Sequence, residues 1–233
     1  MVPLVLLPAM LCDGELYRDQ VGALADLAEP LHLSASASTM AEAARSVLSR
    51  APARFALAGT SAGGNLALEI VASAPERIAG LWLMGANPGA HPDPGAAARL
   101  AARVEAGEYD AVAEELMAQA VYANGPRAAE AAATLRRMAR RFGPDAFLRA
   151  SAALRSRPAR WDALDGLRGP TLLLWGQHDE FVSVERAHEI AARVKSARLV
   201  VLEACGHLPT LEQPDTTTRA ARDWLKSIEA AGG

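Results

Sequence analysis

Three residues of this sequence, Ser61, Asp179 and His207, have the side chains that nucleophilic catalysis requires. A serine hydroxyl is a weak nucleophile at neutral pH, and it needs a base to take its proton and a further group to orient that base. Imidazole and carboxylate side chains can fill these two parts. If the fold brings the three residues together, the chemistry that they could do is attack on a carbonyl carbon.

Ser61 stands in a Gly-x-Ser-x-Gly motif, residues 59–63, between an apolar run and an amphipathic run. A serine at such a strand-to-helix turn has a strained backbone that pushes its hydroxyl out above the sheet. The flanking residues must be small because strand and helix pass close together there, and Gly59 and Gly63 meet that need. The helix that follows offers N–H groups and a positive dipole end to developing negative charge. Taken alone, the motif is also compatible with a glycine-rich turn and a solvated serine.

The elements that must position these residues alternate along the chain. Short apolar runs predict buried strands, and longer amphipathic runs predict helices, which is the pattern of a parallel sheet covered by helices. The predicted strands are residues 2–7, 30–33, 54–58, 78–84, 171–175 and 199–202, and the predicted helices are residues 16–27, 40–49, 64–74, 184–194 and 214–229.

Asp179 and His207 each follow a predicted strand, as Ser61 does. Active sites of open α/β sheets form outside the carboxyl ends of the strands. A lone aspartate after a strand is usually a turn former, and a lone histidine is usually structural. Three such placements in one chain favour a common site.

The alternation of strand and helix stops between residues 87 and 161. Apolar residues there recur at helical spacing, and Gly107, Gly125-Pro126, Gly143-Pro144 and Pro158 divide the segment. A single crossover needs far fewer residues, so we expect a helical cap over one end of the sheet. The core would then comprise residues 1–86 and 162–233. The alternative is a set of ordinary crossover helices.

With these motifs in place, the sequence resembles the α/β-hydrolase fold superfamily over nearly its whole length. Residues 59–64 resemble its Gly-x-Ser-x-Gly-Gly elbow, and residues 176–179 its Gly-x-x-Asp loop. Residues 205–207, followed by Glu212-Gln213-Pro214, resemble its histidine loop. The resemblance implies Ser61 as nucleophile, Asp179 as orienting acid and His207 as general base, with a cap after the sixth strand of the family's usual count.

Two departures from the family pattern affect other positions. Many members have His-Gly after the first strand, and the matching stretch of this chain is Leu7-Pro8-Ala9-Met10-Leu11. The resemblance assigns the oxyanion N–H groups to Met10, with Leu11 as the alternative, and to Ala62. Thr60 stands where a bulky aromatic or histidine is frequent, and we expect it to alter the pocket wall.

Composition excludes several classes of function. The formal net charge of −3 argues against a nucleic-acid binder, and no apolar run is long enough to span a bilayer. Residues 2–8 are apolar but lack the basic start of a signal peptide, so we expect a cytoplasmic protein. Cys12 and Cys205 cannot form a disulfide framework, and we interpret both as free structural thiols. No motif for a metal, nucleotide or organic cofactor is present.

Other polar residues have simpler interpretations. We expect His178 to shape the acid loop, Asp13 to cap a turn, and Asp162 and Asp165 to lie at the wrong end of the sheet to act as the acid. The arginine pairs 136–137 and 140–141 predict a solvated helix face, and we expect His32, His91 and His188 to be structural.

The expected function is hydrolysis of a small carboxylic ester, lactone or thioester through an acyl-enzyme on Ser61. Since one scaffold hosts many reactions, a C–C hydrolase, a lyase, a cofactor-free perhydrolase and a non-catalytic ligand receptor are the alternatives. The sequence does not predict acyl or alcohol preference, stereochemistry or oligomeric state.

Overall fold

Six strands form one sheet in the computed structural model, which describes residues 1–232, and every neighbouring pair is parallel. Gly233, the last residue of the predicted core segment, lies outside the described residues. The strand order is β2-β1-β3-β4-β5-β6. The strands are β1 (Val2–Leu7), β2 (Ala28–His32), β3 (Phe55–Thr60), β4 (Ile78–Met84), β5 (Thr171–Gly176) and β6 (Ala197–Leu202). The predicted fold class, a parallel sheet between helices, is confirmed.

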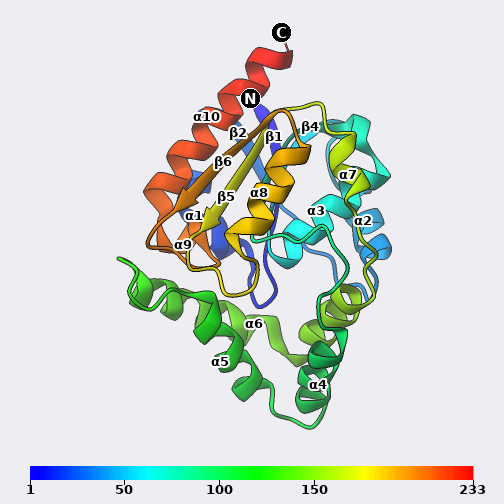
Figure 1. Cartoon of the computed structure of the whole chain (residues 1–233), viewed down its shortest axis with the longest axis vertical. Coiled ribbons are helices and arrows are strands. Elements are labelled where there is room, and N and C mark those ends of the chain that lie inside the picture. Colours follow the sequence, from blue (N-terminus) through cyan, green and yellow to red (C-terminus); the bar gives the residue numbers. More distant parts are fainter. Residues whose placement is uncertain (233) are drawn as a thin grey trace.

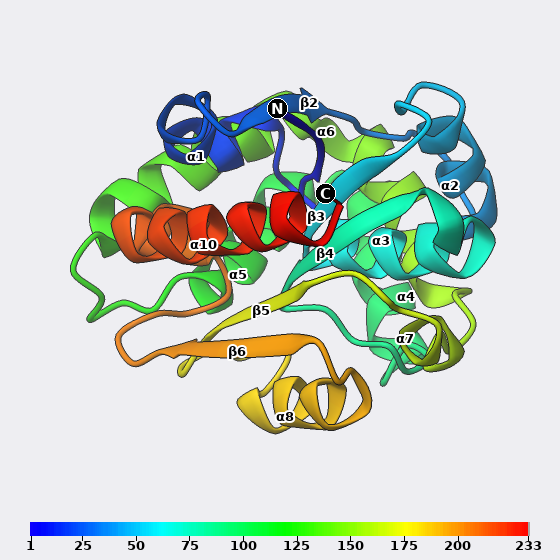
Figure 2. The same cartoon turned by 90° about the horizontal axis from the view of Figure 1, so that it is seen from above.

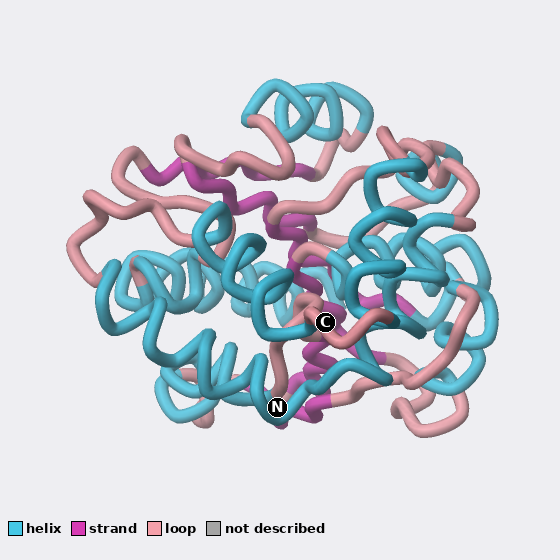
Figure 3. Tube along the Cα trace, turned by 90° about the horizontal axis from the view of Figure 1, so that it is seen from below, coloured by secondary structure: helices cyan, strands magenta, loops and turns pink. Residues whose placement is uncertain are grey.

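The sheet is buried on both faces because alternate residues of its central strands point to opposite sides. In β4, for example, Leu81 and Leu83 join one apolar cluster, whereas Trp82 and Met84 join the other. The first cluster is covered by α2 (Met40–Leu48), α3 (Ala62–Ser73), α7 (Asp162–Asp165) and α8 (Val184–Arg193). The second is covered by α1 (Arg18–Ala23) and α10 (Pro214–Gly232). Figures 2 and 3 show these helices on the two sides of the sheet.

Three longer helices connect β4 to β5. They are α4 (Pro94–Glu105), α5 (Tyr109–Ala120) and α6 (Ala128–Arg155). Asp93 starts α4 by accepting a hydrogen bond from the N–H of Ala96 at 2.7 Å, with Pro94 in the first helical position. The predicted break at Gly143-Pro144 is present as a kink in α6, where Gly143 has φ 75°.

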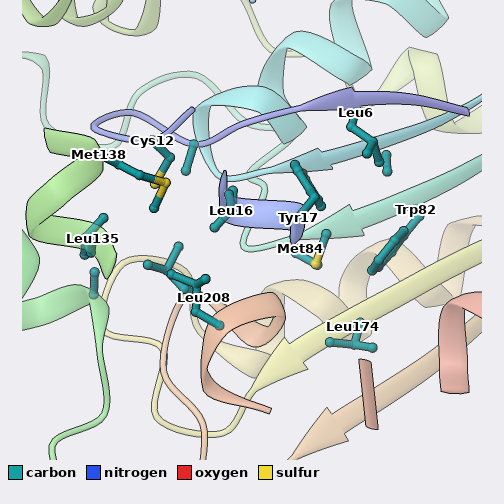
Figure 4. Packing of buried hydrophobic residues seen from close by; sticks show 14 of the residues in the cluster. Leu6, Cys12, Leu16, Tyr17, Trp82, Met84, Leu135, Met138, Leu174 and Leu208 are labelled. Atoms are coloured by element: carbon teal, nitrogen blue, oxygen red, sulfur yellow. The ribbon is translucent and has the colours of Figure 1, made fainter. Parts of the chain in front are cut away.

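We call residues 87–161 the helical insertion. It lies beyond the carboxyl ends of the strands, at the end of the molecule opposite the N-terminus (Figure 1). One apolar cluster continues from Trp82 and Leu174 of the sheet to Leu135 and Met138 of α6 (Figure 4). The insertion is therefore packed on the same hydrophobic core as part of the sheet.

Some predicted boundaries are wrong. The helix expected over residues 16–27 is a short 3-10 turn, Gly14–Tyr17, followed by α1, which ends at Ala23. Gly22 weakens its last turn, and the chain must turn after Leu24 so that Ala28 can pair with Val2. β2 therefore begins two residues before the predicted start, and its Pro30 is tolerated because β2 is an edge strand.

Candidate functional site

Ser61 occupies the tight turn between β3 and α3, with φ 54° and ψ −114°. A positive φ is strained for a residue with a side chain, as predicted for this elbow. The N–H of Ser61 donates to the carbonyl of Met84 at 2.8 Å, which attaches the turn to β4. A Cβ on Gly63 would collide with the carbonyl of Leu7, and one on Gly59 with the carbonyl of Gly63. The expected need for small residues is thus confirmed.

Asp179 and His207 meet at the ends of β5 and β6. Nδ1 of His207 donates to Oδ2 of Asp179 at 2.7 Å, and both side chains are almost fully buried. The other oxygen of Asp179, Oδ1, accepts from the N–H groups of Phe181 and Val182, each at 2.9 Å. The carboxylate is therefore fixed by its own loop, and it fixes the imidazole so that Nε2 remains for another partner.

The imidazole of His207 lies between two neighbours. The ring of Phe181 packs against it with a centroid distance of 4.9 Å. On another side lies Gly85, the residue after β4, with φ +55°. A Cβ on Gly85 would stand 2.5 Å from Cε1 of His207 and 3.1 Å from Oδ2 of Asp179. Only glycine fits there.

The loop that holds His207 is organised around the buried carboxylate of Glu212. Oε2 of Glu212 accepts from the N–H of Gly206 at 2.8 Å, and Oε1 accepts from the N–H of Leu208 at 2.9 Å. These amides flank His207 on both sides. Burial raises the pKa of Glu212 above its ordinary value, although its backbone donors act in the opposite direction.

The helical insertion is bonded to the same loop. Oε2 of Glu212 also accepts from the N–H of Tyr122 at 2.9 Å, and the N–H of His207 donates to the carbonyl of Ala120 at 2.9 Å. The ring of Tyr122 stacks on His178, with centroids 3.8 Å apart and planes within 6°. The chain after α5 is thus joined to both the acid loop and the histidine loop.

A cavity of about 360 Å³ lies between the insertion and the sheet. Its wall includes Ser61 and His207 from the sheet side and Leu100, Leu116 and Phe147 from α4, α5 and α6. Most of the lining is apolar. A small organic molecule could therefore enter beside Ser61, with its apolar part against the insertion.

Two backbone segments could supply N–H groups to a substrate oxygen beside Ser61. Residues 9–12 form a turn, in which the N–H of Cys12 donates to the carbonyl of Ala9 at 3.1 Å and Leu11 has φ 65°. Within the described residues, the amides of Met10 and Leu11 donate to no other group. Ala62 is the first residue of α3, so its N–H has no partner within the helix.

Several other predictions are confirmed by position. Cys12 and Cys205 are buried and free, and burial raises the pKa of both thiols. Asp13 accepts from the N–H of Glu15 at 2.9 Å and so caps the short 3-10 turn. Asp162 and Asp165 lie on α7, before β5 and away from its carboxyl end.

The structure corrects the expectations for Thr60 and His91 and adds detail to the one for the arginine pairs. Thr60 does not line the cavity, because its side chain is buried below the elbow, where its hydroxyl bonds Tyr17 Oη at 2.8 Å. The arginine pairs 136–137 and 140–141 form an exposed helix face, as expected. Three of these arginines are also ion-paired: Arg136 lies 3.0 Å from Glu114, Arg137 lies 2.7 Å from Glu15, and Arg141 lies 2.7 Å from Asp13. His91 lines the cavity, whereas His32 packs near Tyr17 and has the structural position expected.

Gly85 and Arg157 were not expected at this site; Glu212 was named only as part of a motif, and His91 was expected to be structural. Glu212 had a signal, because it belongs to the Glu-Gln-Pro segment after the histidine loop. Arg157 had none, being one of many arginines in the chain. The neighbours of Glu212 and Arg157 in the folded protein include segments that are distant in the sequence.

No group of three or more His, Cys, Asp or Glu side chains within residues 1–232 is arranged to hold a metal ion. Over the same part of the chain, no helix has the length and apolar character needed to cross a bilayer.

Comparison with known proteins gives a family and a set of relatives. The model of the alpha/beta hydrolase family matches residues 5–220. A solved thermophilic esterase from Thermogutta terrifontis is 26% identical, with a TM-score of 0.86 over 98% of this chain and 90% of that chain. An enol-lactonase from Burkholderia xenovorans has a TM-score of 0.85 over 97% of this chain and 91% of that chain. Its 19% identity shows a shared fold alone.

Curated relatives match over shorter stretches. A monoacylglycerol lipase of Mus musculus is 31% identical over 74 residues, which are 32% of this chain and 22% of that protein. The 2-hydroxy-6-oxononadienedioate/2-hydroxy-6-oxononatrienedioate hydrolase 1 of Pseudomonas putida is 28% identical over 174 residues, which are 72% of this chain and 61% of that protein. The chain therefore spans less than two thirds of the length of these relatives.

Proposed function

The chain belongs to the alpha/beta hydrolase family, and from this membership we propose that it is a serine hydrolase cleaving a small carboxylic ester, lactone or thioester. The observation that supports the proposal best is the juxtaposition of groups around one cavity. Ser61 at its strained elbow and His207 line that cavity, and His207 is oriented by Asp179 at 2.7 Å.

In the proposed reaction, His207 takes the proton of the Ser61 hydroxyl as its oxygen attacks the carbonyl carbon. The amides of Met10 and Ala62 hold the resulting oxyanion; the N–H of Ser61 is already bonded to Met84. Such donors typically contribute about 10²–10³-fold each in rate. His207 then gives the proton to the leaving group, and water hydrolyses the acyl-enzyme in a second, equivalent step.

We also propose that residues 87–161 act as a cap and that residues 1–86 and 162–233 form the catalytic core. The two ends of the insertion lie side by side, since the N–H of Arg160 donates to the carbonyl of Pro88 at 2.6 Å. Most residues that line the cavity of Ser61 belong to the insertion. In this arrangement the insertion contacts the variable part of the substrate, and the groups that break the bond belong to the core.

A fluorophosphonate probe tests the nucleophile. We expect the probe to add to the peptide that contains Ser61, and we expect Ser61→Ala to abolish labelling and ester turnover together. Ser151→Ala is the matched control, because Ser151 lines the same cavity and its loss should leave labelling intact. Labelling that survives Ser61→Ala would exclude Ser61 as the nucleophile.

Hydrolysis of a carbon–carbon bond on the same residues is the second candidate reaction. It is favoured by the similarity to the Pseudomonas putida hydrolase, whose name gives 2-hydroxy-6-oxo dioic acids as substrates. A panel containing p-nitrophenyl esters, lactones and one such keto acid separates the two reactions. Turnover of the keto acid with no ester or lactone turnover would replace the ester proposal.

A further inference from the structure

Arg157 is a charged residue in the wall of the cavity that contains Ser61. It lies two residues after the end of α6, and only 8% of its surface is exposed. Several exposed arginines of the insertion, such as Arg136 and Arg141, have carboxylate partners at 3.0 Å or less. Arg157 differs from them because it is buried and has no carboxylate partner among residues 1–232.

The guanidinium of Arg157 has almost no partner in the protein. Nη1 donates to the carbonyl of Leu154 at 2.9 Å, whereas the buried Nε has no hydrogen-bond partner. No carboxylate of residues 1–232 lies within ion-pair distance of it, although Arg160, three residues later, pairs with Glu69 at 2.7 Å. Desolvation lowers the pKa of Arg157 to about 10, so the group remains charged at neutral pH.

The two acidic residues in the same cavity wall have other partners. Asp93 caps α4, and Glu115 pairs with Arg103 at 2.8 Å. Neither carboxylate neutralises Arg157. A buried charge without a counterion is costly, so buried charges in proteins are normally paired. A ligand with a negative charge would supply the partner that Arg157 lacks.

We propose that Arg157 binds a carboxylate of the substrate, so that the physiological substrate is an ester, lactone or thioester with a free carboxylate in its acyl part. This inference rests on the proposed function and narrows its substrate class. A carboxylate suits the site because a single guanidinium fork matches one carboxylate group in charge and geometry. A phosphate has a greater negative charge than one arginine can balance.

The test compares two p-nitrophenyl esters with five-carbon acyl groups, the neutral pentanoate and the glutarate half-ester. Arg157→Met removes the charge and keeps an unbranched side chain. We expect it to lower kcat/KM for the glutarate half-ester by about 10- to 100-fold and to change the pentanoate value by less than about threefold. Arg157→Lys should retain part of the preference. Arg155→Met, two residues earlier and absent from the cavity wall, is the control.

A stability measurement separates binding from a structural role. Because Arg157→Met replaces a buried charge that has no counterion with an apolar side chain, we expect the unfolding temperature to stay the same or rise. Equal losses on both esters together with a lower unfolding temperature would overturn the inference.

Calorimetry of glutarate binding keeps the inference separate from the proposed reaction. We expect glutarate to bind the Ser61→Ala protein and to bind at least about tenfold more weakly after Arg157→Met is added. Equal affinities would overturn the inference even where Ser61-dependent ester hydrolysis is observed. Failure of Ser61-dependent hydrolysis with intact, Arg157-dependent glutarate binding would count against the proposed reaction alone.

Discussion

Two buried carboxylates hold the candidate catalytic base His207, one through its ring and one through its backbone. Asp179 contacts the imidazole of His207 with one oxygen and two amides of its own loop with the other. Glu212 does not contact the imidazole but accepts from the amides before and after His207. Asp179 thus orients the ring, and Glu212 positions the backbone from which the ring projects.

Asp179→Asn should lower kcat by several orders of magnitude and leave the fold intact. An amide at this position favours the wrong tautomer of His207, which in a serine protease costs about 10⁴ in kcat. Its oxygen can still accept from the loop amides, so far-UV circular dichroism should be unchanged. The exposed neighbour supplies the control Glu180→Gln. Turnover close to wild type would mean that the orienting acid lies elsewhere.

Glu212→Gln should reduce the free energy of unfolding by about 2–4 kcal/mol, because an amide leaves buried N–H donors without a full set of acceptors. Urea denaturation measures this loss, and Glu203→Gln, an exposed change in the same loop, is the control. A loss no larger than that of the control would show that the three amide contacts contribute little.

The difference in unfolding free energy between the wild type and Glu212→Gln should depend on pH. The pKa of Glu212 is raised by burial above its ordinary 4.5, so its stabilising contribution is complete below that pH and is lost as pH rises through the folded-state pKa. The glutamine variant lacks this titration. Its deficit in unfolding free energy should therefore be larger near about pH 4 than near about pH 8. A deficit that grows with pH would contradict the assigned direction.

The carboxyl ends of β3, β4, β5 and β6 determine the site. The elbow after β3 presents Ser61, the loop after β5 presents Asp179 and the loop after β6 presents His207. β4 contributes the bare backbone of Gly85, against which the imidazole packs. The parallel arrangement places all four loops at one edge of the sheet.

Gly85→Ala should lower kcat by about 100-fold or more, since a displacement of about 1 Å in a catalytic group has effects of that size. The added methyl would stand 2.5 Å from His207 and force the ring away. Gly107→Ala is the matched control, because Gly107 also has a positive φ, +91°, and has no atom within 4 Å of the added Cβ. Both variants should lose similar stability from backbone strain, and only Gly85→Ala should lose activity. Equal kinetics for the two would exclude a role for the Gly85 contact.

The insertion and the sheet share one cavity and one part of the apolar core. The insertion is also hydrogen-bonded to the histidine loop through Ala120 and Tyr122. Movement of the insertion would therefore disturb the environment of His207 unless these contacts were kept. We expect the segment around Tyr122 to stay fixed in any opening of the cavity.

Leu116→Ala should shift kcat/KM toward longer acyl esters, because Leu116 lines the cavity wall on α5 and its truncation enlarges the cavity. Steady-state rates on acetyl to octanoyl esters measure the shift, and single-turnover acylation separates it from product release. Val112→Ala on the same helix is buried but absent from the cavity wall, so it should reduce stability and leave chain-length preference unchanged. An unchanged preference in folded Leu116→Ala would contradict the assignment of the insertion as a cap.

Much of this structure follows from local patterns in the sequence. The elbow around Ser61, the strands before Asp179 and His207, and the kink at Gly143-Pro144 all depend on residues that are neighbours in the chain. Turn chemistry and hydrophobic periodicity act over a few residues, so they can be recognised without a fold. Each of the three catalytic candidates follows a strand, and in a parallel sheet this is sufficient to predict that they lie at one edge.

Tertiary structure alone determined which groups meet around those candidates. Glu212 and the amide of Tyr122 are 90 positions apart, and only packing of the insertion on the histidine loop brings them to 2.9 Å. Thr60 was expected in the pocket wall, but the position of Tyr17 placed it below the elbow. Arg157 is charged whether or not the chain is folded. Only folding buries its side chain in the cavity wall, away from any carboxylate of the described residues. Such contacts join segments distant in the chain, and no local pattern encodes them.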